Sequence, residues 1–296
     1  MLYPPIPGEH ITIGICSPSH IPNRAEYANT IAAIRACGYG VVEADHLYSD
    51  SHGYLAAPEE RAADLNQLIL DERVNLILFG GGEGSAELLP CIDFDAVSRH
   101  PKCVCSYSDG TTILNAVTAK TGMITYYGQA PYLFDHFSDY DRQHFLRHFV
   151  NGPAGRHFSA VDWMVLGQGT GEGILVGGYL RNFALLLGSK YCPLDLKQDY
   201  VLFLEDHEMF GDVSYVAAML ANIEQSAFMP RVRGLLFGHY SEKRHPHLYA
   251  LLRRVGERWS VPVAYCDDFG HGENHAILPI GCRCVMDTDQ RTLFYK

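Results

Sequence analysis

The sequence predicts an α/β protein of two domains, and three observations indicate this class. In the first half of the chain, short apolar segments such as residues 74–79 alternate with segments of helical pattern. This alternation is typical of a parallel sheet covered by helices on both faces. A polar, glycine-containing stretch follows at residues 150–158, and the second half continues as short runs separated by glycines. The length of 296 residues suits two ordinary domains or one large one.

The first half contains the elements of a Rossmann- or flavodoxin-like parallel sheet. Gly38 follows one helical segment at the position where glycine commonly ends a helix, and Pro58 stands in the first turn of the next. We expect strands at residues 11–16, 41–44, 74–79 and 103–107. We expect helices at residues 24–37, 58–70 and 111–119.

The polar stretch contains Gly152, Pro153 and Gly155 and predicts the crossing between the domains. We therefore expect an N-terminal domain at residues 1–150, a linker at 151–165 and a C-terminal domain at 166–296. The second domain is expected to be an α/β domain richer in β structure, with strands at 163–166, 171–178, 200–204, 234–238 and 263–265. Helices are expected there at residues 213–224 and 247–259.

The composition excludes several classes of protein. Apolar residues make up 47% and charged residues 19%, which argues against a disordered chain. The net charge of −11 argues against a nucleic-acid polymer as partner. The first 14 residues hold three prolines, and no apolar run has the length of a membrane span. We expect neither a secretory signal nor a membrane partner, and a cytoplasmic location.

Nine cysteines spread through the chain do not form a disulfide framework, so we expect reduced thiols. The pairs Cys103/Cys105 and Cys282/Cys284 are expected on strands, where residues two apart share a face. Zinc sites favour pairs separated by two residues, so we interpret these thiols as buried core groups and expect no metal.

A serine between a strand and a helix carries the first chemical signal. Residues 103–107 form an apolar strand, and Ser108-Asp109-Gly110 leads into the helix that follows. This is the geometry of a nucleophile elbow, which lifts the hydroxyl out of the sheet and turns the backbone N–H of Asp109 toward the same space. The alternative is that Ser108 or Asp109 only caps the helix.

The glycine run 80–84 follows the strand at 74–79 in the same half. It matches neither a dinucleotide-binding fingerprint nor a P-loop, because no Lys-Ser/Thr follows. An oxyanion hole shared by this turn and the Asp109 N–H fits better, and an ordinary tight turn remains the alternative.

A serine nucleophile needs a general base and a group that orients the base. Among 15 histidines, His271 stands in a glycine-rich loop after a strand, and Glu205 ends an apolar strand. The alternative is that Glu205 only caps a helix or forms an ion pair. A weaker metallohydrolase hypothesis rests on His239, His245 and His247, which we expect in a solvated polar loop, or on the pair His271 and His275.

Taken together, the motifs resemble one family over nearly the whole chain: the serine peptidases that comprise murein LD-carboxypeptidases and microcin C self-immunity peptidases. The matching segments in the first half are 17–19, 81–82, 87–95, 101–102, 107–109 and 124–128. Those in the second half are 171–180, 202–206, 269–271 and 278–281. Their order and spacing together are more specific than any one segment.

The resemblance implies a Ser-Glu-His triad, with Ser108 as nucleophile, Glu205 as orienting carboxylate and His271 as base. It implies an oxyanion hole of the Gly82 and Asp109 N–H groups, a site between two domains, no cofactor and a homodimer. The serine comes from the first domain, and the carboxylate and histidine from the second.

Departures from the family pattern place specificity in question. Ser106 stands where the family has glycine, and Tyr179 replaces the asparagine of a Gly-Gly-Asn-Leu motif. Gly80 and Glu83 replace an arginine and an aromatic residue around the Gly-Gly pair, and 128–131 replaces a Gly-Pro pair. Residues 87–95 resemble the immunity branch, but its tryptophan-containing insertion is absent and Trp163 fits a strand.

The sequence therefore predicts a serine carboxypeptidase that cleaves a C-terminal amide bond of a short peptide, with murein tetrapeptide as the expected substrate. The first alternative is a self-immunity peptidase that cleaves a peptidyl-nucleotide amide. A second alternative is a non-catalytic peptide- or sugar-binding module. Gly81, Glu83, Tyr179 and Arg181 are candidate substrate-binding residues, and Arg181 is the candidate for the terminal carboxylate.

Overall fold

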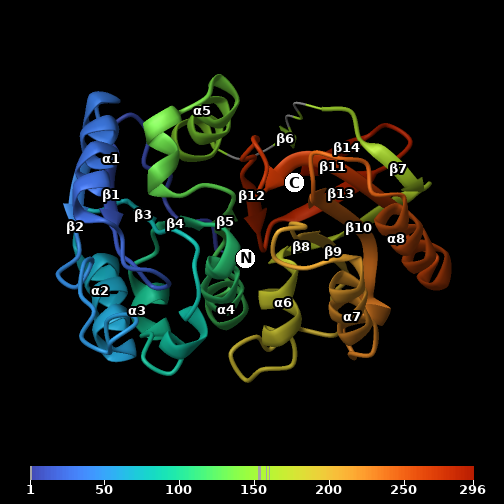
Figure 1. Ribbon diagram of the computed structural model, residues 1–296, viewed down its shortest axis with the longest axis horizontal. Coiled ribbons are helices and arrows are strands. Elements are labelled where there is room, and N and C mark those ends of the chain that lie inside the picture. The colour runs from blue at the N-terminus through green and yellow to red at the C-terminus, as the bar shows by residue number, and fades with distance from the viewer. Residues whose placement is uncertain (1, 153–154, 158, 160) are drawn as a thin grey trace.

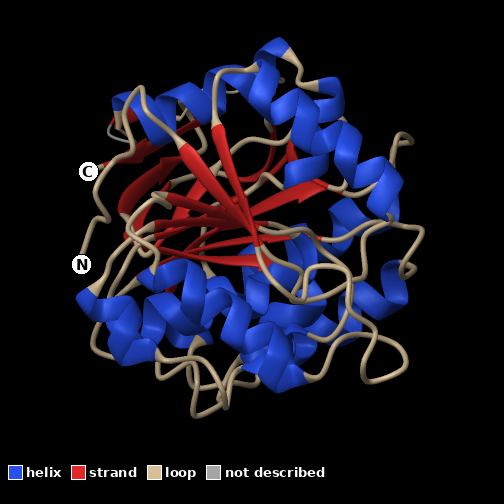
Figure 2. Cartoon of the chain, turned by 90° about the vertical axis from the view of Figure 1, so that its left-hand side faces the viewer, coloured by secondary structure: helices blue, strands red, loops and turns tan. Residues whose placement is uncertain are grey.

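The computed structural model describes residues 2–152, 155–157, 159 and 161–296. The chain forms two sheets, with strands lying between helices (Figures 1 and 2). Residues 153, 154, 158 and 160 of the predicted linker lie outside the described residues, so Pro153 is among them.

The first sheet has six strands in the order β12-β5-β4-β3-β1-β2. Five of them come from the first half and run parallel: β1 (Thr12–Ile15), β2 (Gly40–Glu43), β3 (Leu76–Leu78), β4 (Cys103–Ser106) and β5 (Thr125–Tyr127). The helices between them are α1 (Arg24–Ala36), α2 (Pro58–Leu70), α3 (Phe94–Arg99) and α4 (Thr111–Thr121). The predicted parallel α/β sheet is confirmed, and α2 has the predicted bounds.

The second sheet has eight strands in the order β6-β14-β13-β8-β9-β10-β11-β7. Its parallel centre consists of β8 (Thr170–Tyr179), β9 (Tyr200–Glu205), β10 (Val232–His239) and β11 (Val263–Gly270). Antiparallel strands flank it: β6 (Gly155–Arg156), β7 (Met164–Gly167), β13 (Arg283–Asp287) and β14 (Thr292–Tyr295). Its helices are α6 (Leu180–Leu186), α7 (Val213–Glu224) and α8 (Pro246–Trp259).

Further short helical elements lie between these strands and helices. Helix α5 (Asp139–Leu146) continues into a π-helical turn, Arg147–Asn151. Single 3-10 turns lie at Ser85–Leu88, Ser108–Gly110, Pro131–His136 and Met229–Arg231. Among the described residues, no helix has the length and apolar character to cross a membrane.

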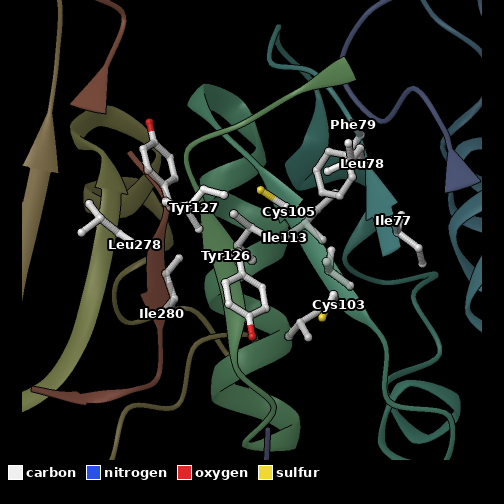
Figure 3. Close-up of a cluster of buried hydrophobic side chains, with 14 of the residues drawn as sticks. Ile77, Leu78, Phe79, Cys103, Cys105, Ile113, Tyr126, Tyr127, Leu278 and Ile280 are labelled. Carbon is white, nitrogen blue, oxygen red and sulfur yellow. The ribbon is translucent and has the colours of Figure 1, made fainter. Parts of the chain in front are cut away.

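One strand crosses between the halves. β12 (Leu278–Ile280) comes late in the chain but pairs antiparallel with β5, at the edge of the first sheet (Figure 1). Its apolar side chains Leu278 and Ile280 lie next to Tyr126 and Tyr127 (Figure 3). The predicted domain boundaries at residues 150 and 165 stay predictions. The edge strand of the first sheet, β12, comes from the second half of the chain.

The cysteine predictions have one correction. All nine cysteines are free, and Cys103 and Cys105 lie buried on β4 as expected. Cys284 lies on β13, but Cys282 precedes that strand and bonds to the Tyr3 hydroxyl at 3.1 Å. Because the chain turns at residue 281, β13 begins only at Arg283, and Cys282 lies just before the strand.

Hydrogen bonds from α4 hold the two halves together. The Thr111 hydroxyl accepts the backbone N–H of Tyr179 at 2.8 Å. The Asn115 amide donates to the Gly177 carbonyl at 2.8 Å and accepts from the Gly177 N–H at 3.3 Å. All of these groups are buried, so the helix behind Ser108 is tied directly to β8.

Candidate active site

Ser108 occupies a sharp turn after β4. It is one of the few non-glycine residues with a left-handed backbone, at φ 54°, which is a strained conformation found at functional turns. Gly110 is required here, because a Cβ at that position would lie 2.1 Å from the Ser106 Oγ. Ser106 itself donates its hydroxyl to the Phe79 carbonyl at 2.8 Å, so this departure from the family pattern braces the turn.

The capping alternative for this motif is wrong. Gly110 is the N-cap of α4, and neither the Ser108 nor the Asp109 side chain accepts a capping hydrogen bond from the backbone N–H groups of that helix. The Asp109 carboxylate instead accepts the Ser85 N–H at 2.8 Å and the Asn182 amide at 2.6 Å. Asp109 thereby connects the serine turn to both the glycine-rich segment and α6.

The structure brings together the three residues predicted as a triad. The Ser108 Oγ lies 3.0 Å from the His271 Nε2, and the His271 Nδ1 lies 2.8 Å from the Glu205 Oε2. Glu205 is the last residue of β9 and is fully buried, and His271 follows the end of β11. β10 separates these two strands, so the side chains converge from next-but-one strands of one sheet.

The environment of His271 favours its charged form. Burial disfavours the imidazolium, but the charge and hydrogen bond of Glu205, together with Asp206, hold the pKa of His271 above its ordinary value. Three aromatic rings surround the imidazole, with centroid distances of 5.3 Å to Tyr107, 5.3 Å to Tyr179 and 4.9 Å to Phe210. No local sequence pattern indicated Tyr107 or Phe210 as neighbours of this histidine.

The glycine run lies directly beside the serine. A Cβ on Gly81 would be 2.6 Å from the Ser108 Cβ, so only glycine allows this approach. Gly82 has φ 135°, and a Cβ there would lie 2.2 Å from the Ser19 carbonyl oxygen. The same carbonyl accepts the Glu83 N–H at 2.9 Å. The Ser17-Pro18-Ser19 segment after β1 therefore supports the glycine turn.

Arg181 lies near the site but has a partner. Its guanidinium donates to the Glu83 carboxylate at 3.0 Å and lies 5.7 Å from the centre of the Tyr179 ring. The Glu83 side chain is 78% exposed, so solvent weakens this ion pair. The structure thus groups Glu83, Tyr179 and Arg181 at one edge of the serine site.

Asp206 is a buried carboxylate that the sequence did not single out. Its Oδ1 accepts the His207 N–H at 2.8 Å, whereas its Oδ2 has no hydrogen-bond partner among the described residues. Burial, with a smaller contribution from Glu205, raises the pKa of Asp206 to about 7. Asp206 directly follows Glu205 in the sequence, but its carboxylate does not share the hydrogen bond of Glu205 to His271.

The histidines considered as metal ligands occupy other environments. His239 was expected in a solvated loop, but it ends β10 and is buried, with its Nδ1 2.9 Å from Asp267. That strand continues into the polar segment because its last residues still pair with β11. His245 bonds to Glu208 at 2.8 Å, and His275 lies 3.4 Å from Asp141. Within the described ranges, no three His, Cys, Asp or Glu residues are grouped to hold a metal.

A left-handed serine within reach of a histidine and a carboxylate, on a two-sheet α/β fold, is an arrangement typical of hydrolases. Comparison with known families identifies the branch. The LD-carboxypeptidase N-terminal domain matches residues 13–128, and the LD-carboxypeptidase C-terminal domain matches residues 172–286. This chain belongs to the LD-carboxypeptidase family of peptidases, as its motifs predicted.

Known relatives extend over most of the chain. A protein of Treponema pallidum, provisionally named a carboxypeptidase, is 29% identical and covers 88% of this chain and 83% of its own. A probable murein peptide carboxypeptidase of Bacillus subtilis is 26% identical, with 95% and 90% covered. The microcin C7 self-immunity protein MccF of Escherichia coli is 26% identical, with 79% and 77% covered.

Solved structures show the same fold. MccF in complex with aspartyl sulfamoyl adenosine superposes with a TM-score of 0.87 at 23% identity, covering 100% of this chain and 98% of its own. This likeness confirms the predicted two-domain α/β fold.

Proposed function

We propose that this protein is a serine carboxypeptidase in which Ser108, His271 and Glu205 form the catalytic triad. The observation that carries the proposal is the continuous hydrogen-bonded chain from the Ser108 Oγ through His271 to Glu205, built on a left-handed serine. The rival non-catalytic binding module requires no such alignment, and a separation between serine and histidine would have favoured it.

In the proposed reaction, the Ser108 Oγ attacks the carbonyl carbon of the amide while His271 Nε2 takes the hydroxyl proton. His271 then gives this proton to the nitrogen of the leaving amine as the C–N bond breaks, which leaves an acyl ester on Ser108. Water attacks the ester with its proton passing to His271, and Ser108 regains a proton as the acid product leaves. Glu205 orients the imidazole and stabilises its charged form in both steps.

The oxyanion of each tetrahedral intermediate is proposed to accept hydrogen bonds from the Gly82 and Asp109 N–H groups. Two features support this assignment. Gly81 packs against the Ser108 side chain, which brings the glycine turn beside the nucleophile. Asp109 follows the nucleophile at the start of a helical turn, where backbone N–H groups point outward.

We propose a murein tetrapeptide as substrate, with its C-terminal carboxylate bound by Arg181. Arg181 is a cation at the rim of the site, and its partner Glu83 is mostly exposed. An aminoacyl- or peptidyl-nucleotide amide is the second candidate, supported by the relation to MccF. The burial of Trp163 favours the peptide, because its ring cannot stack on a nucleobase.

The decisive experiment combines active-site labelling with a substrate panel. We expect a fluorophosphonate probe to label the protein once, at Ser108, and Ser108→Ala to lose label and at least about 10³-fold in kcat. Hydrolysis of a murein tetrapeptide, but not of a sulfamoyl nucleotide conjugate, would establish the first substrate. Unchanged hydrolysis by Ser108→Ala would refute the triad, and loss of wild-type activity on chelation would favour a metallohydrolase.

A further inference from the structure

Tyr127 is a buried phenol to which neither the family resemblance nor the proposed reaction assigns a role. It is the last residue of β5, fully buried, and its neighbour Tyr126 is also fully buried. The two rings leave the strand in opposite directions, so their hydroxyls lie in separate environments (Figure 3). This arrangement provides a pair of matched tyrosines on one strand.

The Tyr127 hydroxyl makes two hydrogen bonds that meet at the proposed triad. Its O–H donates to the Glu205 Oε1 at 2.5 Å, and its oxygen accepts the backbone N–H of Ser108 at 3.1 Å. Tyr127 belongs to the first sheet and Glu205 to the second, so one hydroxyl connects the nucleophile turn to the carboxylate across the two halves.

The ring has little freedom to move. Its centroid lies 5.5 Å from that of Phe203, and a Cβ on Gly178 would lie 3.1 Å from the Tyr127 Cδ2. Both contacts come from the second sheet. The hydroxyl is therefore held where the Ser108 amide and the Glu205 carboxylate can both reach it.

We propose that Tyr127 is a positioning residue for the serine reaction, an inference that rests on the proposed function. With Tyr127 on Oε1 and His271 on Oε2, both oxygens of Glu205 are fixed, so the oxygen that faces the imidazole is determined. The Ser108 N–H is directed to Tyr127 and away from any oxyanion. The bond thereby stabilises the left-handed serine and leaves oxyanion binding to other N–H groups.

The bond also controls the charge that Glu205 presents to His271. A donor on Oε1 draws negative charge away from Oε2. Removing this donor should concentrate charge beside the imidazole and raise the pKa of His271. The other ionisable groups around His271 remain in place: Asp206 and His207 after β9, Tyr107 after β4, and Tyr179 at the end of β8.

The test compares Tyr127→Phe with the matched control Tyr126→Phe, which removes a buried hydroxyl that touches neither Ser108 nor Glu205. We expect Tyr127→Phe to lower kcat and the rate of fluorophosphonate labelling by about 10- to 100-fold, with little change in KM. NMR titration should show a higher His271 pKa, and the acid limb of kcat/KM should move to higher pH. The control should match the wild type in each measurement.

A second variant covers the case in which Tyr127→Phe does not fold. Replacement of Tyr127 by 3-fluorotyrosine keeps the shape but makes the hydroxyl a stronger donor, so the His271 pKa should fall. Equal rates and an equal His271 pKa in Tyr127→Phe and the control would overturn the proposal, as would no pKa change with 3-fluorotyrosine. If the wild type is neither labelled nor active, the proposed function fails, and the NMR titration alone still decides whether Tyr127 acts on His271.

Discussion

The proposed nucleophile side and the proposed acid–base side of the site are built in different ways. Ser108 stands in one continuous segment, β4 to α4, and its turn is supported from within the first sheet, by the bond from Ser106 to the Phe79 carbonyl and by Tyr127. Glu205 and His271 are 66 residues apart in sequence and meet only because β9, β10 and β11 are adjacent in the sheet. The serine turn is thus a local motif, whereas the acid–base pair depends on the assembled second sheet.

The difference predicts how each side responds to substitution. On the nucleophile side, the position of the Ser108 hydroxyl and the geometry of the backbone turn determine the reaction. Substitutions there should therefore change the rate of attack and the binding of the oxyanion. On the acid–base side, charge determines the imidazole pKa, so changes should also move the pH profile. Measurements of kcat and of the pH profile in variants of each side separate these two responses.

The largest effect beyond loss of the serine itself is expected from Glu205→Gln. The amide removes the charge that raises the His271 pKa and no longer fixes the imidazole, so kcat should fall by about 10³- to 10⁴-fold. Because His271 loses the stabilisation of its charged form, the acid limb of kcat/KM should move to lower pH. Steady-state kinetics between pH 5 and pH 9 measure both changes.

Glu208→Gln is the control for that experiment. Glu208 lies three residues further on and pairs with Ser241 and His245, away from His271. It should leave kcat and the pH profile close to those of the wild type. A Glu205→Gln enzyme with an unshifted acid limb would show that the carboxylate does not govern the imidazole.

Gly82→Ala tests the nucleophile side. The added Cβ would collide with the Ser19 carbonyl, and φ 135° is unfavourable for alanine, so the glycine turn must shift. Displacement of a proposed oxyanion donor should lower kcat by about 10²- to 10³-fold, without moving the acid limb. Kinetics across the same pH range provide the measurement.

Gly38→Ala is the matched control for backbone strain. Gly38 also has a left-handed φ, 88°, but a Cβ there meets no atom within 4 Å. It should lower the melting temperature through strain while leaving kcat unchanged. If both variants lose activity equally, general destabilisation rather than the oxyanion turn explains the effect.

The same contrast explains what the sequence could predict. Strands β1 to β4 are mostly apolar and the serine turn has a motif, so they could be placed from local pattern. β5 and β12 of the same sheet have only three residues each and were not predicted as strands. β11 extends beyond its predicted end because Asp267 and Asp268 interrupt the apolar run but still belong to the strand. The short helix α5 is mostly polar, so it carries no clear amphipathic pattern.

Contacts between residues far apart in the chain could not be predicted from local sequence patterns. Tyr127 and Glu205 are 78 residues apart, and nothing in the local pattern of β5 indicates a bond between them. Glu205 and His271 were found only because strand ends and the family resemblance pointed to them. The pairing of β12 with β5 likewise joins segments far apart in the chain, beyond the reach of periodicity.

A smaller effect is expected at the rim, where Arg181 and Glu83 form the exposed ion pair. Arg181→Met should raise KM about tenfold for a substrate with a free C-terminal carboxylate and much less for its amide. Glu83→Gln frees the guanidinium and should lower the same KM. Arg254→Met, an exposed change on α8, controls for the loss of one positive charge from a chain of net charge −11.

Equal KM changes for the acid and the amide would remove Arg181 from carboxylate recognition. If Glu83→Gln raises KM as Arg181→Met does, the ion pair itself, rather than a free guanidinium, supports the site.

The smallest effect is expected from Asp206→Asn, on the acid–base side. The carboxylate has a pKa of about 7, so it gains charge near His271 as the pH rises through neutrality. Its removal should lower the His271 pKa and move the acid limb to lower pH by less than about one unit.

The same carboxylate affects stability. Because burial raises the pKa of Asp206 in the folded state above its unfolded value, Asp206 lowers the stability of the wild type as the pH rises from about 4 to about 7. Asp206→Asn should therefore gain melting temperature relative to the wild type as the pH rises, whereas Asp289→Asn, exposed in the turn after β13, should not. A pH-independent difference would show that the pKa of Asp206 is the same in the folded and unfolded states, which would contradict its elevation by burial.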